Sequence, residues 1–156
     1  MLMPTPDPGL LARRAEFVSA LRAIVPGEGV ISEDSQLAAY ECDGLTAYRQ
    51  RPMIVVLPGT VDQVSAVLAY CHGVGLKVVP RGSGTSLSGG ALPLADGIIL
   101  GLGKFNRILE VDYENRCAVV QPGVTNLAVT HAVMGEGFYY APDPSSQIAC
   151  SIGGNV

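Results

Sequence analysis

One stretch of the sequence, residues 79–91, limits most strongly what this chain can fold into. It follows a short apolar run and contains four glycines, four hydroxyl side chains and one arginine. Because glycine has no Cβ and tolerates positive φ, successive backbone N–H groups can converge there on one anion. The hydroxyl groups add neutral donors, and Arg81 adds a permanent positive charge. This glycine-rich loop (residues 79–91) therefore has the composition of a phosphate-binding loop that follows a strand.

Two familiar phosphate-binding motifs do not fit the glycine-rich loop. A Walker A loop ends in Gly-Lys-Ser/Thr, and the only lysines of the chain are Lys77 and Lys104. A Rossmann fingerprint begins well with Gly82 and Gly84, but Leu87 occupies the place of the third glycine. From the residues alone, a surface loop without a ligand stays open as the alternative.

A second loop, residues 141–155, has related chemistry. Prolines on either side of Asp143 stiffen the backbone, and two serines follow as donors. The glycine pair 153–154 again lets the backbone approach a ligand closely. Such a stiff segment and a backbone cradle can together clamp a flat cofactor, although a proline-rich surface turn stays open as the other interpretation.

The two loops resemble, in the same order, the flavin-contacting segments of the FAD-linked oxidases of the vanillyl-alcohol oxidase type. Within that family, residues 40–45 and 139–141 resemble most the D subunits of bacterial glycolate oxidases. The resemblance implies an α+β fold with a PCMH-type FAD-binding domain. In this fold a small βαβ subdomain precedes a mainly antiparallel second subdomain, which we expect to be truncated here. The expected domain limits are residues 16–156, with residues 1–15 forming a tail and the start of the first helix.

The resemblance also implies which residues bind FAD. They are Pro80, Arg81, Gly82, Ser83, Gly84, Thr85, Ser86, Ser88 and Gly89 in the first loop, and Pro142, Asp143, Ser145, Ser146, Ser151, Ile152, Gly153, Gly154 and Asn155 in the second. Family members with covalent flavin have a histidine in the first loop, whereas this chain has Thr85. We therefore expect FAD to be held without a covalent bond, and Cys150 to be a packing residue.

In function, the resemblance implies a 2-hydroxy-acid dehydrogenase that oxidises glycolate to glyoxylate and transfers the hydride to FAD. D-lactate or D-2-hydroxyglutarate as substrate, a non-catalytic FAD-binding subunit and a generic anion-binding α+β module stay open as alternatives. The implied partners are a second flavin-type subunit and an iron–sulfur subunit, in the cytoplasm or peripherally at the inner membrane face. Catalytic residues are expected beyond Val156, so we expect the chain alone not to oxidise glycolate. We also expect its second loop to be unanchored and the chain alone therefore to hold FAD weakly.

Composition excludes several other classes of protein. The net charge of −4, the pI near 5.0 and the lack of a basic stripe argue against nucleic acid as a partner. The longest apolar runs are too short to span a bilayer. No metal site is expected, because the cysteines are well separated and only two histidines are present. Reduced thiols are expected at Cys42, Cys71, Cys117 and Cys150.

The apolar periodicity predicts the order of helices and strands. Helix-capping and turn residues set most of the limits. Asp43, in the irregular region 40–48, is expected to anchor a loop, and Cys71 to belong to the core. The change from helices to short strands after the glycine-rich loop suggests two small subdomains. The expected elements are a helix over 10–25, a short helix over 35–41, strands over 53–57 and 78–79 joined as a parallel unit by a helix over 60–73, strands over 97–101, 107–111 and 116–121, and a helix over 126–134.

Overall fold

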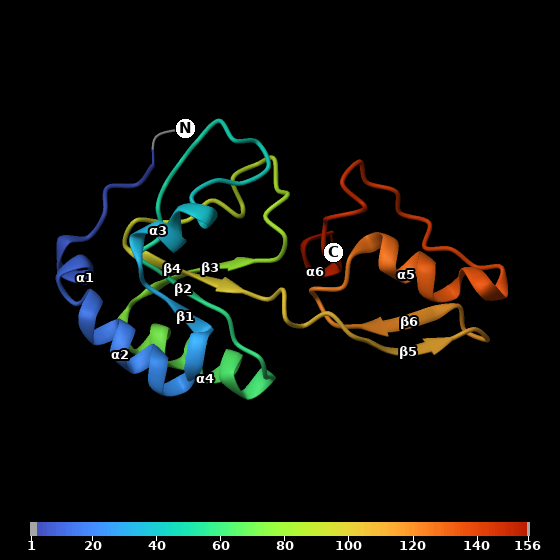
Figure 1. Ribbon diagram of the computed structural model, residues 1–156, viewed down its shortest axis with the longest axis horizontal. Coiled ribbons are helices and arrows are strands. Elements are labelled where there is room, and N and C mark those ends of the chain that lie inside the picture. The colour runs from blue at the N-terminus through green and yellow to red at the C-terminus, as the bar shows by residue number, and fades with distance from the viewer. Residues whose placement is uncertain (1–2, 156) are drawn as a thin grey trace.

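The computed structural model describes residues 3–155 and consists of two parts that lie side by side (Figure 1). Residues 1, 2 and 156, at which the expected domain limits begin and end, lie outside the described residues. In chain order, the elements of the first part are α1 (Pro8–Ala12), α2 (Arg14–Ile24), the 3-10 helix η1 (Gly27–Gly29), β1 (Val30–Ile31), α3 (Asp34–Leu37), η2 (Ala38–Tyr40), β2 (Ile54–Val56), α4 (Val61–Val74), β3 (Lys77–Arg81) and β4 (Gly97–Gly101). Those of the second part are β5 (Ile108–Asp112), β6 (Cys117–Val120), α5 (Asn126–Val133), η3 (Met134–Glu136) and α6 (Ile152–Asn155).

The first part is built on a four-stranded sheet with the order β1-β2-β4-β3. Strands β2 and β3 both pair with β4 in parallel, and β1 pairs with β2 antiparallel. The expected parallel arrangement of β2 and β3 is therefore confirmed, but β4 lies between them. Strand β4 follows the glycine-rich loop, where the sequence changes from helices to short strands, and it still belongs to the first sheet. Its residues are buried on both faces, as in a central parallel strand.

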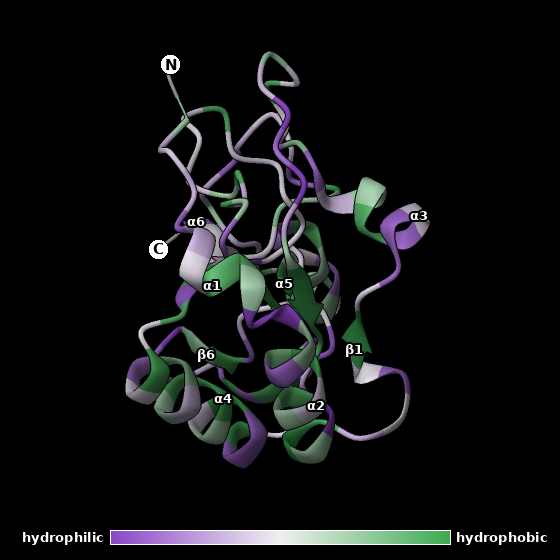
Figure 2. Cartoon of the chain, turned by 90° about the vertical axis from the view of Figure 1, so that its left-hand side faces the viewer, coloured by the Kyte–Doolittle hydropathy of each residue, from purple (hydrophilic) through white to green (hydrophobic). Residues whose placement is uncertain are grey.

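Two layers of side chains cover the sheet. Ile54, Ile98 and their same-face neighbours pack against α2 and α4, and Val55 and Ile99 pack against Leu37 of α3. This alternation follows from the two-residue period of a strand. Strand β1 is hydrophobic, whereas α2 and α4 each carry both hydrophobic and hydrophilic residues (Figure 2). The sheet is thus covered by packed side chains on both of its faces.

The helices of the first part begin and end largely where their capping residues indicate. The hydroxyl of Thr60 accepts from the N–H of Gln63 at 3.2 Å, and α4 ends at Gly75 in the left-handed conformation. The side chain of Gln63 returns to the N–H of Gly59 rather than to that of the capping residue. Cys71 is buried in the core as expected, and burial raises the pKa of its thiol to about 11. The single helix expected over residues 10–25 is wrong, since the chain forms α1 and α2 with a break at Arg13.

A buried carboxylate ties the amino-terminal edge of the sheet. Asp96, only 2% exposed, precedes β4 and accepts from the ammonium of Lys77 at 2.5 Å and from the N–H of Asp7 at 2.8 Å. Burial raises the pKa of Asp96, but these hydrogen bonds and the charge of Lys77 outweigh it, so that the pKa lies below its ordinary value. The ionised form is therefore favoured by folding.

We expect Asp96→Asn to lower the free energy of unfolding by about 1 kcal/mol at pH 7, a small value because Lys77 is partly exposed and screened. A carboxylate with a lowered pKa contributes stability above its unfolded pKa of about 3.9, and loses that contribution as pH falls through the folded pKa. Urea unfolding of both proteins at pH 7 and at the lowest pH at which they fold checks this. A difference that did not shrink on acidification would contradict it.

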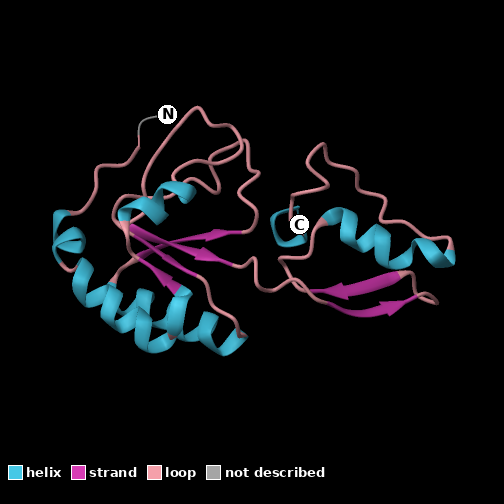
Figure 3. Cartoon of the chain, viewed as in Figure 1, coloured by secondary structure: helices cyan, strands magenta, loops and turns pink. Residues whose placement is uncertain are grey.

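The second part consists of a hairpin covered by one helix. Strands β5 and β6 pair antiparallel across the turn at residues 112–115, and the pairing has a bulge near Glu110. Helix α5 begins after Thr125, whose hydroxyl caps the helix by accepting from the N–H of Ala128. The loop that carries α6 returns from the far end of α5 toward the sheet (Figure 3). No helix within residues 3–155 has the length and apolarity that crossing a membrane requires.

Candidate functional site

The glycine-rich loop leaves the carboxyl end of β3, and a cavity of about 360 Å³ opens beside it. This is the edge at which parallel sheets commonly bind ligands. Both loops contribute to the wall of the cavity, although they lie far apart in the sequence. The lining residues are Pro80, Arg81, Gly82, Ser83, Gly84, Thr85, Ser86, Gly90 and Ala91 from the first loop and Ser146, Ser151, Gly154 and Asn155 from the second.

Two further cavities adjoin the first one. A space of about 450 Å³ shares Gly82, Ser83 and Ser151 with it and reaches the start of α5, and a smaller space of about 120 Å³ reaches Pro122. The loops meet where all three cavities share Gly82 and Ser151. A Cβ on Gly82 would overlap the hydroxyl of Ser151, so this close approach requires glycine.

The structure brings most of the predicted FAD-binding residues to these walls. All but six of them line the cavity of about 360 Å³ beside the glycine-rich loop, called the main cavity here, or the space of about 120 Å³. Their contact with a cofactor stays a prediction. Sequence reasoning missed residues from outside the two loops, such as Asn106 and Thr125, which line the second cavity. The predicted residues that line none of the three cavities are Ser88, Gly89, Pro142, Asp143, Ser145 and Ile152.

The end of the second loop is firmly held, so the expectation of an unanchored loop is wrong. Ser151 forms a β-bridge with Thr125, and the N–H of Ile152 donates to the carbonyl of Val124 at 2.8 Å. The N–H of Gly153 donates to the carbonyl of Pro122 at 2.9 Å. These partners precede α5 and belong to the chain itself, which is why the sequence near residue 156 alone gave no sign of them.

The same loop also completes the amino-terminal end of α5. The carbonyl of Cys150 accepts from the N–H of Asn126, and that of Gln147 from the N–H of Leu127, both at 3.1 Å. The buried side chain of Asn126 donates to the carbonyl of Pro142 at 3.0 Å. The first-turn N–H groups of a helix otherwise lack partners, so loop and helix stabilise each other.

Arg81 shapes the glycine-rich loop from within. One of its terminal nitrogens donates to the carbonyls of Cys42 at 2.9 Å and Ala91 at 3.1 Å, and its guanidinium lies 5.8 Å from the ring centre of Tyr40. Gly84, which has a φ of +73°, lies against this guanidinium so closely that a Cβ would overlap it. Arg81 therefore links three segments of chain and also places positive charge in the cavity wall.

Asp43 anchors the glycine-rich loop from the other side, as the sequence led us to expect. Its buried carboxylate accepts from the N–H groups of Leu45 and Gly89, both at 3.1 Å. The N–H of the adjacent Gly44 donates to the carbonyl of Ser86 at 3.0 Å. The backbone donor of Gly89 is therefore already bonded within the protein.

Among residues 3–155, Arg81 provides the only charged side chain in the walls of the three cavities. No imidazole, carboxylate or amine of residues 3–155 lines them, so the described wall can bind an anion but offers no general base. Lys104 donates to the carbonyl of Leu57 at 3.0 Å and is not among the residues that line these cavities. In the described part of the chain, no cluster of three or more His, Cys, Asp or Glu residues could hold a metal.

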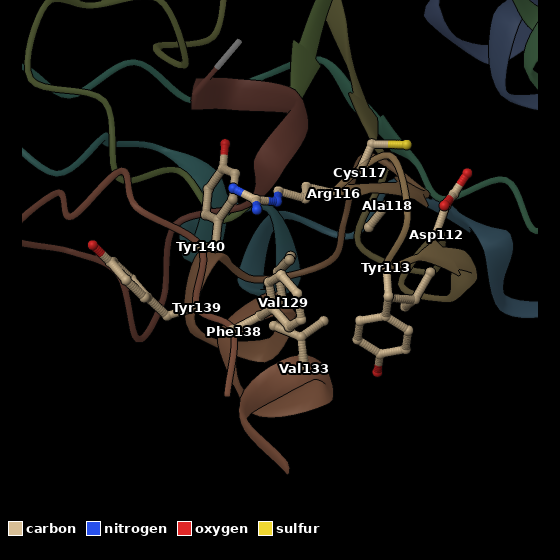
Figure 4. A pocket seen from close by; sticks show the side chains of 11 residues that line it. Asp112, Tyr113, Arg116, Cys117, Ala118, Val129, Val133, Phe138, Tyr139 and Tyr140 are labelled. Carbon is tan, nitrogen blue, oxygen red and sulfur yellow. The ribbon is translucent and has the colours of Figure 1, made fainter. Parts of the chain in front are cut away.

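A separate small cavity lies between the hairpin and α5 and includes none of the predicted site residues. Val129, Val133 and Phe138 gather at its centre, while Arg116 extends toward Tyr140 (Figure 4). The ring centres of Tyr113 and Phe138 lie 5.5 Å apart. Its volume of about 90 Å³ equals only a few water molecules, so it reflects packing of the second part rather than a ligand site.

Several known proteins are similar to this chain in sequence or in fold. Glycolate oxidase subunit GlcD of Escherichia coli (strain K12) is 55% identical over 143 residues, which cover 92% of this chain and 29% of that protein. D-2-hydroxyglutarate dehydrogenase of Xanthomonas citri pv. viticola is 32% identical over 139 residues, which cover 89% of this chain and 29% of that protein. The structure of p-cresol methylhydroxylase with substrate bound matches with a TM-score of 0.71 and 26% identity, over 88% of this chain and 27% of that chain.

The chain thus spans less than a third of the length of these curated relatives. A protein-family profile described as an FAD binding domain matches residues 52–156, more than half of the chain, and this range includes both loops of the site. The family match in sequence and the structural match in fold point to the same kind of domain. The chain therefore belongs to the family of PCMH-type FAD binding domains.

Proposed function

We propose that this chain is the FAD-binding part of a 2-hydroxy-acid dehydrogenase, with glycolate as the preferred substrate. The observation that carries the proposal is the single cavity formed by the two loops, in a chain 55% identical to a glycolate oxidase subunit. The alternative of a generic anion-binding module would not require the second loop to meet the first. In this chain, Gly82 and Ser151 are fitted to each other at that meeting point.

The residues around the cavity fit the groups of FAD. Gly82 and Gly84 line the cavity with backbone alone, because a Cβ there would overlap Ser151 or Arg81. Ser83, Thr85 and Ser86 supply hydroxyl donors for a pyrophosphate. Arg81 contributes a positive charge to the same wall. From the second loop, Ser146, Ser151 and Asn155 supply further donors to the cavity, and we propose that they face the rest of the cofactor.

In the proposed reaction, this part of the protein binds and orients rather than transfers protons. FAD, when bound, supplies the acceptor for the hydride that leaves the α-carbon of the hydroxy acid. The hydrogen bonds that anchor the second loop would keep its donors in place for the cofactor. The fit of Gly82 against the hydroxyl of Ser151 would keep the two loops together. Since no general base lines the described wall, the group that takes the hydroxyl proton comes from elsewhere in the assembled enzyme.

We further propose that FAD is held without a covalent bond. Thr85 occupies the loop position at which covalent relatives carry histidine. Cys150 is 2% exposed and lies outside the three cavity walls, and its sulfur accepts from the side chain of Asn155 at 3.3 Å. This burial supports a packing role rather than a flavin link.

The same likeness supports proposals on partners and place in the cell. We propose a 2-hydroxy-acid substrate and an assembly with a second flavin-type subunit and an iron–sulfur subunit that carries electrons onward. Contact with the inner membrane face would then pass through those subunits, from the cytoplasm. D-2-hydroxyglutarate is the second candidate substrate, favoured by the 32% identity to a dehydrogenase of that acid. D-lactate and a non-catalytic FAD-binding role are separated from these by the same experiment.

The test uses one preparation of the 156-residue chain mixed with FAD and freed of excess cofactor. We expect a flavin absorbance spectrum, release of all the colour into the supernatant on acid precipitation, and no glycolate-dependent reduction of a dye above the free-flavin background. A colourless protein would contradict FAD binding, and colour in the pellet would contradict the non-covalent mode. Dye reduction would show that a base is present after all. Bleaching by glycolate, D-lactate or D-2-hydroxyglutarate in the longer natural protein then identifies the substrate, and no bleaching indicates a non-catalytic subunit.

A further inference from the structure

Asp43 occupies an unusual place for a carboxylate. It is 5% exposed and lies in the irregular segment between η2 and β2, beneath a loop that we propose binds an anion. Burying a carboxylate is costly unless hydrogen bonds satisfy it, and two backbone N–H groups do so here. The position of this carboxylate beside a proposed anion site therefore needs a structural explanation.

The contacts of Asp43 and of its neighbour enclose one turn of the glycine-rich loop. The carboxylate of Asp43 holds the N–H of Gly89, and the N–H of Gly44 holds the carbonyl of Ser86. The two ends of the turn 86–89 are therefore fixed by two consecutive residues that are about forty positions earlier in the chain. A Cβ on Gly44 would lie 2.9 Å from the carbonyl oxygen of Thr85, so the two segments are already in closest contact.

This turn divides the glycine-rich loop into two sides. Residues 80–86 and 90–91 line the main cavity, whereas Leu87, Ser88 and Gly89 do not. Leu87 is 65% exposed, so no packing of its own side chain holds the turn down. The hydrogen bonds from residues 43 and 44 therefore fix the turn on the side of the loop that faces away from the cavity. They thereby also orient residues 80–86, which face the cavity.

We infer that Asp43 is a positioning residue for the cofactor: it holds the turn 86–89 so that the amides and hydroxyls of residues 82–86 keep the arrangement that receives the pyrophosphate. The inference rests on the proposed function. A carboxylate is needed because both of its oxygens face N–H donors. Asparagine would turn an NH₂ group toward one of them, and the loop would lose one bond and gain a donor–donor contact.

The experiment compares Asp43→Asn with the matched control Asp96→Asn. Asp96 is equally buried and also bonds a backbone N–H, but it lies at the opposite, amino-terminal edge of the sheet. FAD affinity is measured by flavin fluorescence, and exchange of the Gly89 amide is measured by NMR without FAD. We expect Asp43→Asn to weaken FAD binding about tenfold and to speed exchange at Gly89 at least about tenfold, the equivalent of about 1.4 kcal/mol. Asp96→Asn should change neither.

Each outcome decides a different point. Unchanged FAD affinity in a folded Asp43→Asn protein would overturn the positioning role while leaving the proposed function intact, and so would a parallel loss of affinity in both variants. If the parent chain bound no FAD, the proposed function would be wrong, and the exchange rate at Gly89 would still decide whether Asp43 holds the loop. Should Asp43→Asn fail to fold, Gly44→Ala is used instead, because a Cβ on Gly44 would push against the carbonyl of Thr85 and displace the same turn. This variant must then show the same loss of FAD affinity.

Discussion

Gly84→Val is expected to lower the affinity for FAD about hundredfold, an effect of about 2.7 kcal/mol on binding. Gly84 has a φ of +73°, a conformation that costs a residue with a side chain about 1 to 2 kcal/mol and a β-branched residue more. The new side chain would also overlap the guanidinium of Arg81. That guanidinium is held by the carbonyls of Cys42 and Ala91, so the loop rather than the arginine has to move.

The measurement is a fluorescence titration with FAD, together with urea unfolding of the same proteins. Gly135→Val is the matched control, because a Cβ at Gly135 meets nothing within 4 Å and the residue lies in η3, away from the cavity. We expect the control to bind FAD as the parent does. A folded Gly84→Val protein with unchanged affinity would remove the glycine-rich loop from the proposed site.

Gly153→Ala is expected to release the second loop and to weaken FAD binding about thirtyfold. A Cβ on Gly153 would lie 2.5 Å from the Cβ of Pro122 and 3.1 Å from its Cα and its carbonyl oxygen. These are atoms of a rigid ring and of the backbone, so the loop must move away. Its bonds from Gly153 to Pro122 and from Ile152 to Val124 then break. Two backbone hydrogen bonds at about 1 kcal/mol each account for an effect of this size.

Its matched control is the same substitution one residue later. A Cβ on Gly154 meets only the hydroxyl of Ser151, at an ordinary 3.9 Å. Amide exchange at Ile152 should therefore become faster in Gly153→Ala and stay unchanged in Gly154→Ala, and the FAD titration reports the binding effect of the first. If Gly153→Ala kept both the protection of Ile152 and the affinity for FAD, the anchoring described for this loop would not matter for binding.

Local chemistry in the sequence predicted the parts of this protein that depend on nearby residues. The cap at Thr60, the core position of Cys71 and the turn of the β5–β6 hairpin follow from short-range patterns, and the structure has them. The composition of residues 79–91 indicated an anion-binding loop after a strand, and the loop does leave the carboxyl end of β3 beside a cavity. Such features need only a few consecutive residues, because capping, turn formation and backbone access are local properties.

Only the tertiary structure decided what joins distant segments. Strand β4 enters the first sheet between β2 and β3, a placement that depends on burial of both of its faces rather than on its neighbours in sequence. The fit of Gly82 against Ser151, the hold of Asp43 on Gly89 and the bonds from residues 152 and 153 to the segment before α5 each join residues far apart in the chain. Hydrogen bonds and close backbone contacts of this kind leave no periodic signal in a single sequence, since each depends on the path of two separate segments. The sequence therefore determined the chemistry of the two loops, and the packing of the two parts determined that they form one site.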